Sequence, residues 1–333
     1  MNKRNAGLEW LRLFALAGTL LTLLLDDTLL ASLTGLRVHL YWLMKAAALM
    51  LSGCFPLLSG YMGYGRPCRW RRLARLLLQA LVIGLGVKAL WTVIDPGGSA
   101  ACAWWEMLLP IHSRAWSYLC AYLVCFLVSP LLDEGIRQFT DGALRAASLL
   151  LIFACCFVSM LSGFDPFYLG LEPGALWLIL CRIWGASARR LHWFEGWSVR
   201  RLLLCLAVIP VLGWLSRPVL SRISLAVTEY GFMTSWMVDF RSPLLLMGSL
   251  MLLTLFRRLP VTRAPGRLSP GVWSTYLLLA HPLVLSRLLP QLETRLAALP
   301  GWALCLLPLA AVLVSGAGSL LLRLPFCFMK EPD

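Results

Sequence analysis

Long apolar runs constrain the fold of this chain more than any other feature of its sequence. A run crosses the hydrocarbon core of a bilayer as a helix when it contains about 20 mostly apolar residues. Such runs cover residues 8–25, 39–62, 76–94, 116–132, 144–162, 174–188, 202–215, 243–256, 272–289 and 302–322. The pattern predicts an all-α membrane protein, a polytopic bundle of about ten transmembrane helices.

The composition agrees with a chain that lies almost wholly in a membrane. Of its 333 residues, 59% are hydrophobic and 14% are charged, whereas a soluble domain is about half apolar and a quarter charged. No polar block is long enough for a separate globular domain, so residues 1–333 are predicted to form a single transmembrane domain. Lys3 and Arg4 precede the first run as in a signal peptide. The polar residues within that run, and Asp26 and Asp27 after it, favour an uncleaved first span.

The positive charge of the chain indicates how it is oriented. The formal net charge is +14, and the basic residues lie mainly between apolar runs that share one side of the membrane. Cytoplasmic loops carry this excess of Lys and Arg, so both termini are predicted to be cytoplasmic in a multi-pass protein of the cell membrane. The charge therefore does not indicate a nucleic acid as partner. The 11 cysteines are scattered without ligand spacing, so we expect small buried side chains, no metal and no bound cofactor.

Polar side chains interrupt several of the apolar runs. At about 100° per residue, Arg12, Thr19 and Asp26 fall on one face of the first helix, with Glu9 close by. Ionisable residues at membrane depth usually face a bundle interior or a water-filled cavity. The alternative is that Glu9 and Arg12 only extend to the headgroups. Other polar residues within runs are His39, Lys45, Ser59, Tyr61, Lys88, Tyr118, Tyr122, Arg182 and His281. As a set they indicate a polar cavity; one by one, they could simply fix helix packing.

The strongest basic cluster lies between the second and third runs. It consists of Arg66, Arg69, Arg71, Arg72 and Arg75. Retention of this loop in the cytoplasm would be enough to explain the cluster. The functional alternative is recognition of a phosphorylated donor, because guanidinium groups bind phosphate in bidentate fashion.

Several stretches, taken in order, resemble the bacterial integral-membrane type 3 acyltransferases. They are LEWLRLFALAG, PLLSGYMG with RWRRLARLL, SRAWSYLCAYLVCFLVSPLL, PGALWLILCRIWGASARR, FRSPLLLMGSLMLLTLF and STYLLLAHPLV. The resemblance covers about Leu8 to Pro282. It implies a ten-helix protein that moves an acyl group, often acetyl, from acyl-CoA to a hydroxyl of a cell-surface glycan or its lipid-linked precursor. Membrane lipids are further expected partners.

The resemblance assigns roles to particular residues. Arg12 matches the first-span arginine, and Ser59 and Gly60 match the SGF-type motif. Trp116 matches the leading tryptophan of the fourth span. Arg71, Arg72 and Arg75 match the basic stretch that meets the coenzyme A phosphates.

The chain departs from the family where a base is needed. The position of the first-span histidine is occupied by Leu23, which can do no proton chemistry. In the ninth span the family's Tyr-Leu-Ile-His is replaced by Tyr276-Leu277-Leu278-Leu279, and His281 follows two residues later. His281 or Asp26 would then have to act as the base. The hypotheses are an O-acyltransferase and, from another class, a non-catalytic binding or assembly partner in envelope glycan biosynthesis. A flippase is less well supported because no inverted repeat is evident.

Overall fold

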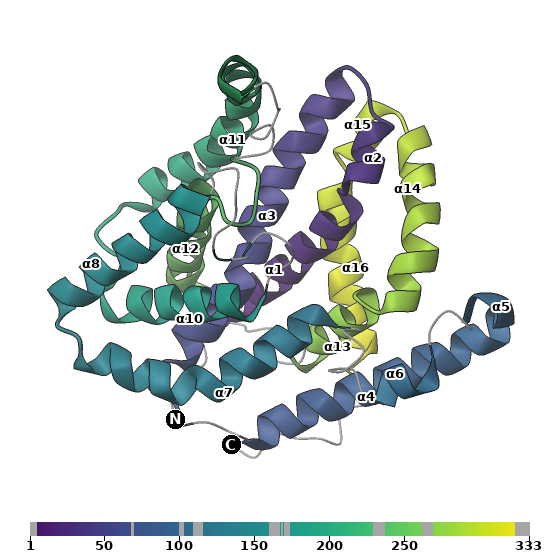
Figure 1. Cartoon of the computed structure of the whole chain (residues 1–333), viewed down its shortest axis with the longest axis horizontal. Helices are drawn as coiled ribbons and strands as arrows, with labels where there is room; N and C mark the ends of the chain where they lie inside the picture. The colour runs from purple at the N-terminus through teal and green to yellow at the C-terminus, as the bar shows by residue number, and fades with distance from the viewer. Residues whose placement is uncertain are drawn as a thin grey trace.

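The computed structural model describes residues 5–67, 70–99, 103–108, 116–159, 167, 169, 174–228, 237–261 and 269–323 (Figure 1). Its long helices are α1 (Ala6–Leu24), α3 (Leu36–Gly63), α4 (Trp70–Ile94), α7 (Ser117–Gln138), α8 (Asp141–Ile152), α10 (Ala175–Arg190), α11 (Val199–Thr228), α12 (Pro243–Arg258), α13 (Ser269–Leu279) and α16 (Leu307–Leu321). The shorter elements are α2 (Asp27–Ala31), α5 (Pro96–Ser99), α6 (Trp104–Leu108), η1 (Phe153–Val158), η2 (Val284–Leu288), α14 (Leu289–Ala298) and α15 (Gly301–Leu304). Each predicted apolar run is helical over most of its described residues, and these residues contain no strand.

Seven helices among these residues are long and apolar enough to cross a membrane. They are Ala6–Leu24, Leu36–Gly63, Leu73–Ile94, Ser117–Gln138, Asp141–Val158, Val199–Val219 and Gly301–Leu321. This confirms the prediction of an all-helical membrane protein. Two other predicted spans form α10 and α12, which have 16 residues each. The ninth run forms a bent pair. The count of ten and the cytoplasmic placement of both termini therefore stay predictions.

The bent pair joins Gly271–Leu279 to Val284–Ala298 at an angle of 55°. Pro282 lies at the break, and because proline has no backbone N–H it cannot continue the hydrogen-bond ladder of α13. The chain resumes as the π-helix η2 and then as α14. His281 lies within this break, where the backbone is not helical.

The central helix of the bundle is α3, which packs against α1, α10, α11 and α12 (Figure 1). Small residues allow the backbones to approach closely, as in other membrane helix pairs. A Cβ atom on Gly18 of α1 would lie 2.8 Å from the backbone nitrogen of Ser52, and one on Gly7 would lie 1.8 Å from the carbonyl oxygen of Phe256. Neither glycine can be replaced without moving a helix.

Large apolar side chains also cover the outside of the bundle. Val93 on α4, Leu131 on α7, Leu204 on α11 and Leu321 on α16 are 81%, 75%, 66% and 66% exposed. Contiguous apolar surface of this kind is unusual for a soluble monomer and is typical of a membrane-facing protein. The polar side chains must therefore meet one another inside the bundle or at its ends.

Side-chain caps fix where several helices begin. Asn5, Asp26, Thr140 and Ser242 each accept a hydrogen bond from a backbone N–H in the first turn of the following helix. These residue types are the preferred N-caps. Asp26 was predicted to extend the polar face of the first helix. That placement is wrong, because α1 ends at Leu24 and Asp26 instead begins α2.

Candidate functional site

The start of α1 meets the ends of α3, α10 and α12 at one end of the bundle. We call this the basic end and define it by Arg12, Arg189, Arg190, Arg257 and Arg258. Asn5 Nδ2 donates to the carbonyl oxygen of Arg257 at 2.9 Å, which joins α1 to α12. The charge bias of the sequence predicts that this end is cytoplasmic, and that orientation stays a prediction.

Arg12 lies one turn after Glu9 on α1 and is paired with it. Its Nη1 donates to both carboxylate oxygens of Glu9 at 3.1 Å, and its Nη2 contacts Met62 Sδ at 3.2 Å. The Glu9 side chain is 2% exposed, whereas that of Arg12 is 20% exposed. Glu9 is therefore enclosed and holds the arginine in place, while part of the Arg12 side chain stays exposed. A ligand reaching Arg12 would meet a partly neutralised cation.

Two arginines at the end of α10 cap the ends of neighbouring helices. Arg189 Nη1 donates to two carbonyl oxygens at the end of α3, at 2.9 and 3.2 Å. Arg190 Nη2 donates to the carbonyl oxygen of Phe139 at 2.6 Å and pairs with Asp141 at 2.9 Å. The last carbonyls of a helix have no partner within the helix, and a cation there also complements the helix dipole. Part of the excess of arginine at this end therefore stabilises the ends of helices.

A short loop between α10 and α11 is held against the end of α12 by a further ionic group. Arg257 pairs with Glu195 at 2.5 Å, His192 Nδ1 lies 2.8 Å from the same carboxylate, and Arg258 donates to backbone oxygens of the loop. Partial burial alone would raise the pKa of Glu195. The hydrogen bond with His192 and the charge of Arg257 outweigh burial and lower it.

The Ser59–Gly60 motif lies where α3 crosses α10. A Cβ atom on Gly60 would lie 2.2 Å from the carbonyl oxygen of Arg182, and one on Gly185 would lie 2.2 Å from that of Leu57. The glycines therefore let the two backbones touch, as small residues do in membrane helix pairs. Ser59 is partly buried beside this crossing. Its predicted role in donor binding stays a prediction.

The basic cluster after α3 begins α4. Arg71 is exposed and Arg75 is partly buried in the first turns of this helix, whereas the side chain of Arg72 lies outside the described residues. α4 begins at Trp70, a short way along the chain from the end of α3. Arg71 and Arg75 thus lie 8 and 12 residues along the chain after Gly63, the last residue of α3, whose last turn Arg12 and Arg189 contact.

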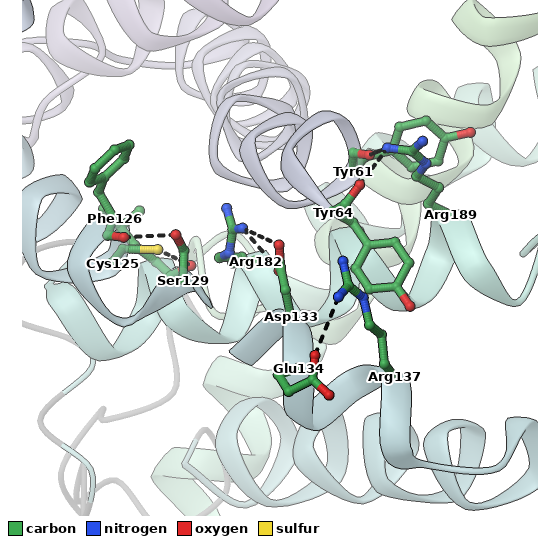
Figure 2. A network of polar contacts seen from close by, with 11 residues as sticks. Tyr61, Tyr64, Cys125, Phe126, Ser129, Asp133, Glu134, Arg137, Arg182 and Arg189 are labelled. Atoms are coloured by element: carbon green, nitrogen blue, oxygen red, sulfur yellow. Dashed lines mark hydrogen bonds and ion pairs between the residues drawn. The ribbon is translucent and has the colours of Figure 1, made fainter. Parts of the chain in front are cut away.

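An ion pair that the sequence did not indicate lies deeper between α7 and α10 (Figure 2). Arg182 Nη2 donates to both carboxylate oxygens of Asp133 at 2.9 Å. The two side chains are 9% and 8% exposed. Figure 2 shows one nitrogen of the guanidinium group on the carboxylate and another directed away from it. Arg182 was predicted as a polar residue within the run 174–188, whereas Asp133 was predicted to lie just after the run 116–132.

His281 is fully buried at the break after α13. Its ring packs edge-on against Trp116, with 5.6 Å between ring centroids, and it lies beside Gly84 of α4. Its Nδ1 accepts a hydrogen bond from the backbone N–H of Leu283 at 3.1 Å. In the neutral ring Nε2 then carries the proton. Nε2 has no partner of ordinary hydrogen-bond geometry among the described residues.

This geometry gives His281 the properties of a hydrogen-bond donor. A general base needs a free lone pair directed at the hydroxyl group that it deprotonates. The lone pair on Nδ1 is already used by the backbone, and Nε2 holds a proton. His281 would have to exchange this hydrogen bond to act as a base, and that role stays a prediction.

Asp26 lies beyond the far end of α1 and caps α2. Its Oδ1 accepts a hydrogen bond from the backbone N–H of Leu29 at 2.8 Å. From Arg12 to Asp26 the chain advances by 14 residues, a rise of about 21 Å if it were all helix. Arg12 and Asp26 are thus at opposite ends of α1, and the structure does not bring them together. The predicted catalytic role of Asp26 stays a prediction.

Comparisons with known protein families, curated proteins and solved structures found no match. The site must therefore be judged from its own residues.

The described residues contain no cluster of three His, Cys, Asp or Glu side chains that could hold a metal ion. They offer instead paired guanidinium groups at and below the basic end. Such groups can bind phosphate and carbonyl oxygens. Two acidic partners, Glu9 and Asp133, set how much of Arg12 and Arg182 remains for a ligand. The sequence placed Glu9 close to Arg12 on the first helix. Asp133 was missed because the fourth run was taken to end at Leu132, whereas α7 continues to Gln138.

Proposed function

We propose that this protein is a membrane acyltransferase that moves an acyl group, acetyl by resemblance, from acyl-CoA to a hydroxyl of a cell-envelope glycan. The observation that carries the proposal is the arrangement of the basic end. There, the partly exposed Arg12 and the last turn of α3 contact each other, and the exposed Arg71 begins the next helix. The resemblance to type 3 acyltransferases gives the same residues to the donor.

The proposed reaction needs a donor site and a base. The acceptor hydroxyl oxygen attacks the thioester carbonyl carbon, the carbon–sulfur bond breaks, and the hydroxyl proton is passed on as the thiolate leaves. Arg12 and the Arg71, Arg72 and Arg75 group would hold the phosphates and orient the donor, because a fixed guanidinium group binds phosphate strongly. The base would be His281 or Asp26. Coenzyme A is a substrate here and not a resident cofactor.

The second candidate function is a non-catalytic one. Leu23 occupies the family's histidine position. The Nδ1 lone pair of His281 accepts a hydrogen bond from the backbone, and Asp26 caps α2. A chain with these three features would bind an acyl donor or a glycan precursor without transferring the acyl group. It would then act as a binding or assembly partner in envelope glycan biosynthesis.

Turnover by purified protein separates the two functions. Full-length protein in nanodiscs is incubated with acetyl-CoA, with and without a glycan acceptor, and release of free coenzyme A is followed. Arg12→Ala and His281→Ala are compared with wild type and with Arg145→Ala, which changes an exposed arginine on α8. The acyltransferase proposal expects turnover that Arg12→Ala reduces about ten- to hundredfold, since the substitution removes a charged contact to the donor.

One result would decide against the enzyme, and another would decide against the residues assigned to it. Inert wild-type protein that gains turnover when Leu23→His is introduced would show that the natural chain is a binding protein in an acyltransferase fold. Wild-type turnover that survives both Arg12→Ala and His281→Ala would show that the chemistry lies elsewhere in the chain.

A further inference from the structure

The helix α14 is an arm that lies against the outside of the bundle. It belongs to the second half of the bent pair, which turns by 55° at Pro282, and it packs against α2 (Figure 1). Most of its side chains are exposed, and its two buried ones are Glu293 and Leu296. Arg37 on α3 also holds the end of the arm, because its Nη2 donates to the carbonyl oxygen of Ala297 at 2.5 Å. A break between helices can act as a hinge, so these contacts decide whether the arm stays in place.

Glu293 is buried against another carboxyl group. It is 6% exposed, and its side chain forms a hydrogen bond with that of Asp26, the residue that caps α2. Asp26 Oδ1 also accepts the capping hydrogen bond from the backbone N–H of Leu29 at 2.8 Å. An ionised carboxylate has only acceptor oxygens, so two carboxyl groups form a hydrogen bond only when one of them holds a proton. The contact between α2 and α14 therefore contains a shared proton.

No cation among the described residues takes the place of this proton. Neither Asp26 nor Glu293 forms a salt bridge within that part of the chain, and the neighbouring Lys45 contacts Asp27 at 3.5 Å and the hydroxyl of Tyr41 at 2.9 Å instead. Loss of the proton would leave two carboxylates in contact, and like charges so close repel each other. The other charged or titratable groups on the elements around the pair are Asp27, Arg37, Tyr41, Lys45, Arg287 and Arg295.

We propose that Asp26 and Glu293 form a proton-dependent latch that holds α14 against α2. In a detached arm each carboxyl group would ionise near its ordinary pKa of about 4. Attachment above that pH therefore takes up a proton, and the latch weakens as pH rises and the proton leaves. The arm is then released about the break at Pro282. The latch lies at the end of α1 opposite the basic end, so it responds to the pH on one side of the membrane only. The inference goes beyond the proposed function and does not depend on it.

Hydrogen exchange of the backbone amides of α14 tests the latch. Full-length protein in nanodiscs is measured at about pH 5, above the ordinary pKa of a free carboxyl group, and at about pH 8. Each rate is corrected for the exchange of an unstructured peptide at the same pH. Glu293→Gln gives the pair a permanent N–H donor, so its contact needs no proton. Asp26→Asn does the same from the other side and keeps a preferred N-cap residue. Glu134→Gln, which changes an exposed carboxyl group on α7, is the matched control.

The proposal expects the protection of α14 in wild type to fall about tenfold between the two pH values, the size of one lost hydrogen bond to a charged group. Protection should be the same at both pH values in Glu293→Gln and Asp26→Asn, whereas Glu134→Gln should follow wild type. Wild-type protection that does not change with pH, or a fall of equal size in the two latch variants, would overturn the inference. Each latch variant tests the pair by itself, so one that fails to fold leaves the other to decide.

Discussion

The Arg182–Asp133 pair allows a quantitative test of the bundle interior. Both side chains are more than nine-tenths buried, and Nη2 lies 2.9 Å from each carboxylate oxygen. Removing one partner leaves an unpaired buried charge, which costs about 3–5 kcal/mol. We therefore expect Arg182→Met to lower the free energy of unfolding by about 3–5 kcal/mol. Replacing both partners, with Asp133→Leu added, should restore most of this loss because no charge then remains buried.

A surface pair on the same helix provides the control. Arg137 and Glu134 are 3.3 Å apart, but their side chains are 52% and 57% exposed. Exposed pairs contribute about 0–1 kcal/mol, so Glu134→Gln should change stability by less than about 1 kcal/mol. The measurement is equilibrium unfolding in mixed detergent micelles of all three variants. An Arg182→Met effect no larger than that of Glu134→Gln would refute the reasoning, since the pair would then be solvated.

Three further predictions concern helix packing, a buried hydrogen bond and the pH dependence of stability. Gly60→Ala should lower the free energy of unfolding by about 1–3 kcal/mol through overpacking against α10, whereas Gly142→Ala, which meets open space on α8, should be neutral or slightly stabilising. Trp116→Phe should cost about 1–3 kcal/mol in the same assay, because its Nε1 donates to the buried carbonyl oxygen of Leu277 at 3.0 Å. The lowered pKa of Glu195 means that its stabilising contribution is present above the unfolded pKa and is lost as pH falls through the folded pKa. Thermal stability should thus fall less steeply below about pH 4.5 in Glu195→Gln than in wild type.

The sequence predicted the helices well and their polar partners poorly. The described residues of the apolar runs are mostly helical because a segment in lipid must satisfy its backbone groups internally. The fourth run was predicted to end at Leu132, two residues after Pro130, but one proline removes a single hydrogen bond from the helix, and α7 continues to Gln138. Asp133 therefore lies on a helix and meets Arg182. That contact depends on how α7 and α10 pack, which no local pattern determines.

Asp26 shows a different case, in which two local signals in the sequence conflicted. Helical periodicity placed Asp26 on the face of Arg12. Aspartate before a helical segment is also a preferred N-cap, and this preference prevails because α1 ends at Leu24. The role of Gly60 was indicated by its motif, but only the structure identifies the backbone of Arg182 as the surface that it meets.

The depth of the site explains why the absence of a histidine at position 23 matters. Leu23 lies 17 residues after Ala6, a rise of about 25 Å from the start of α1, whereas Arg12 lies only about 9 Å from it. Leu23 is thus about 16 Å further along α1 than Arg12, and a donor arm anchored at the basic end would have to reach that far to meet a base there. His281 is the buried histidine beside Gly84 of α4. Its backbone-bonded Nδ1 makes it a donor to an acyl carbonyl oxygen more readily than a base. A slow enzyme whose turnover rises with Leu23→His, and still requires His281, would fit both residues.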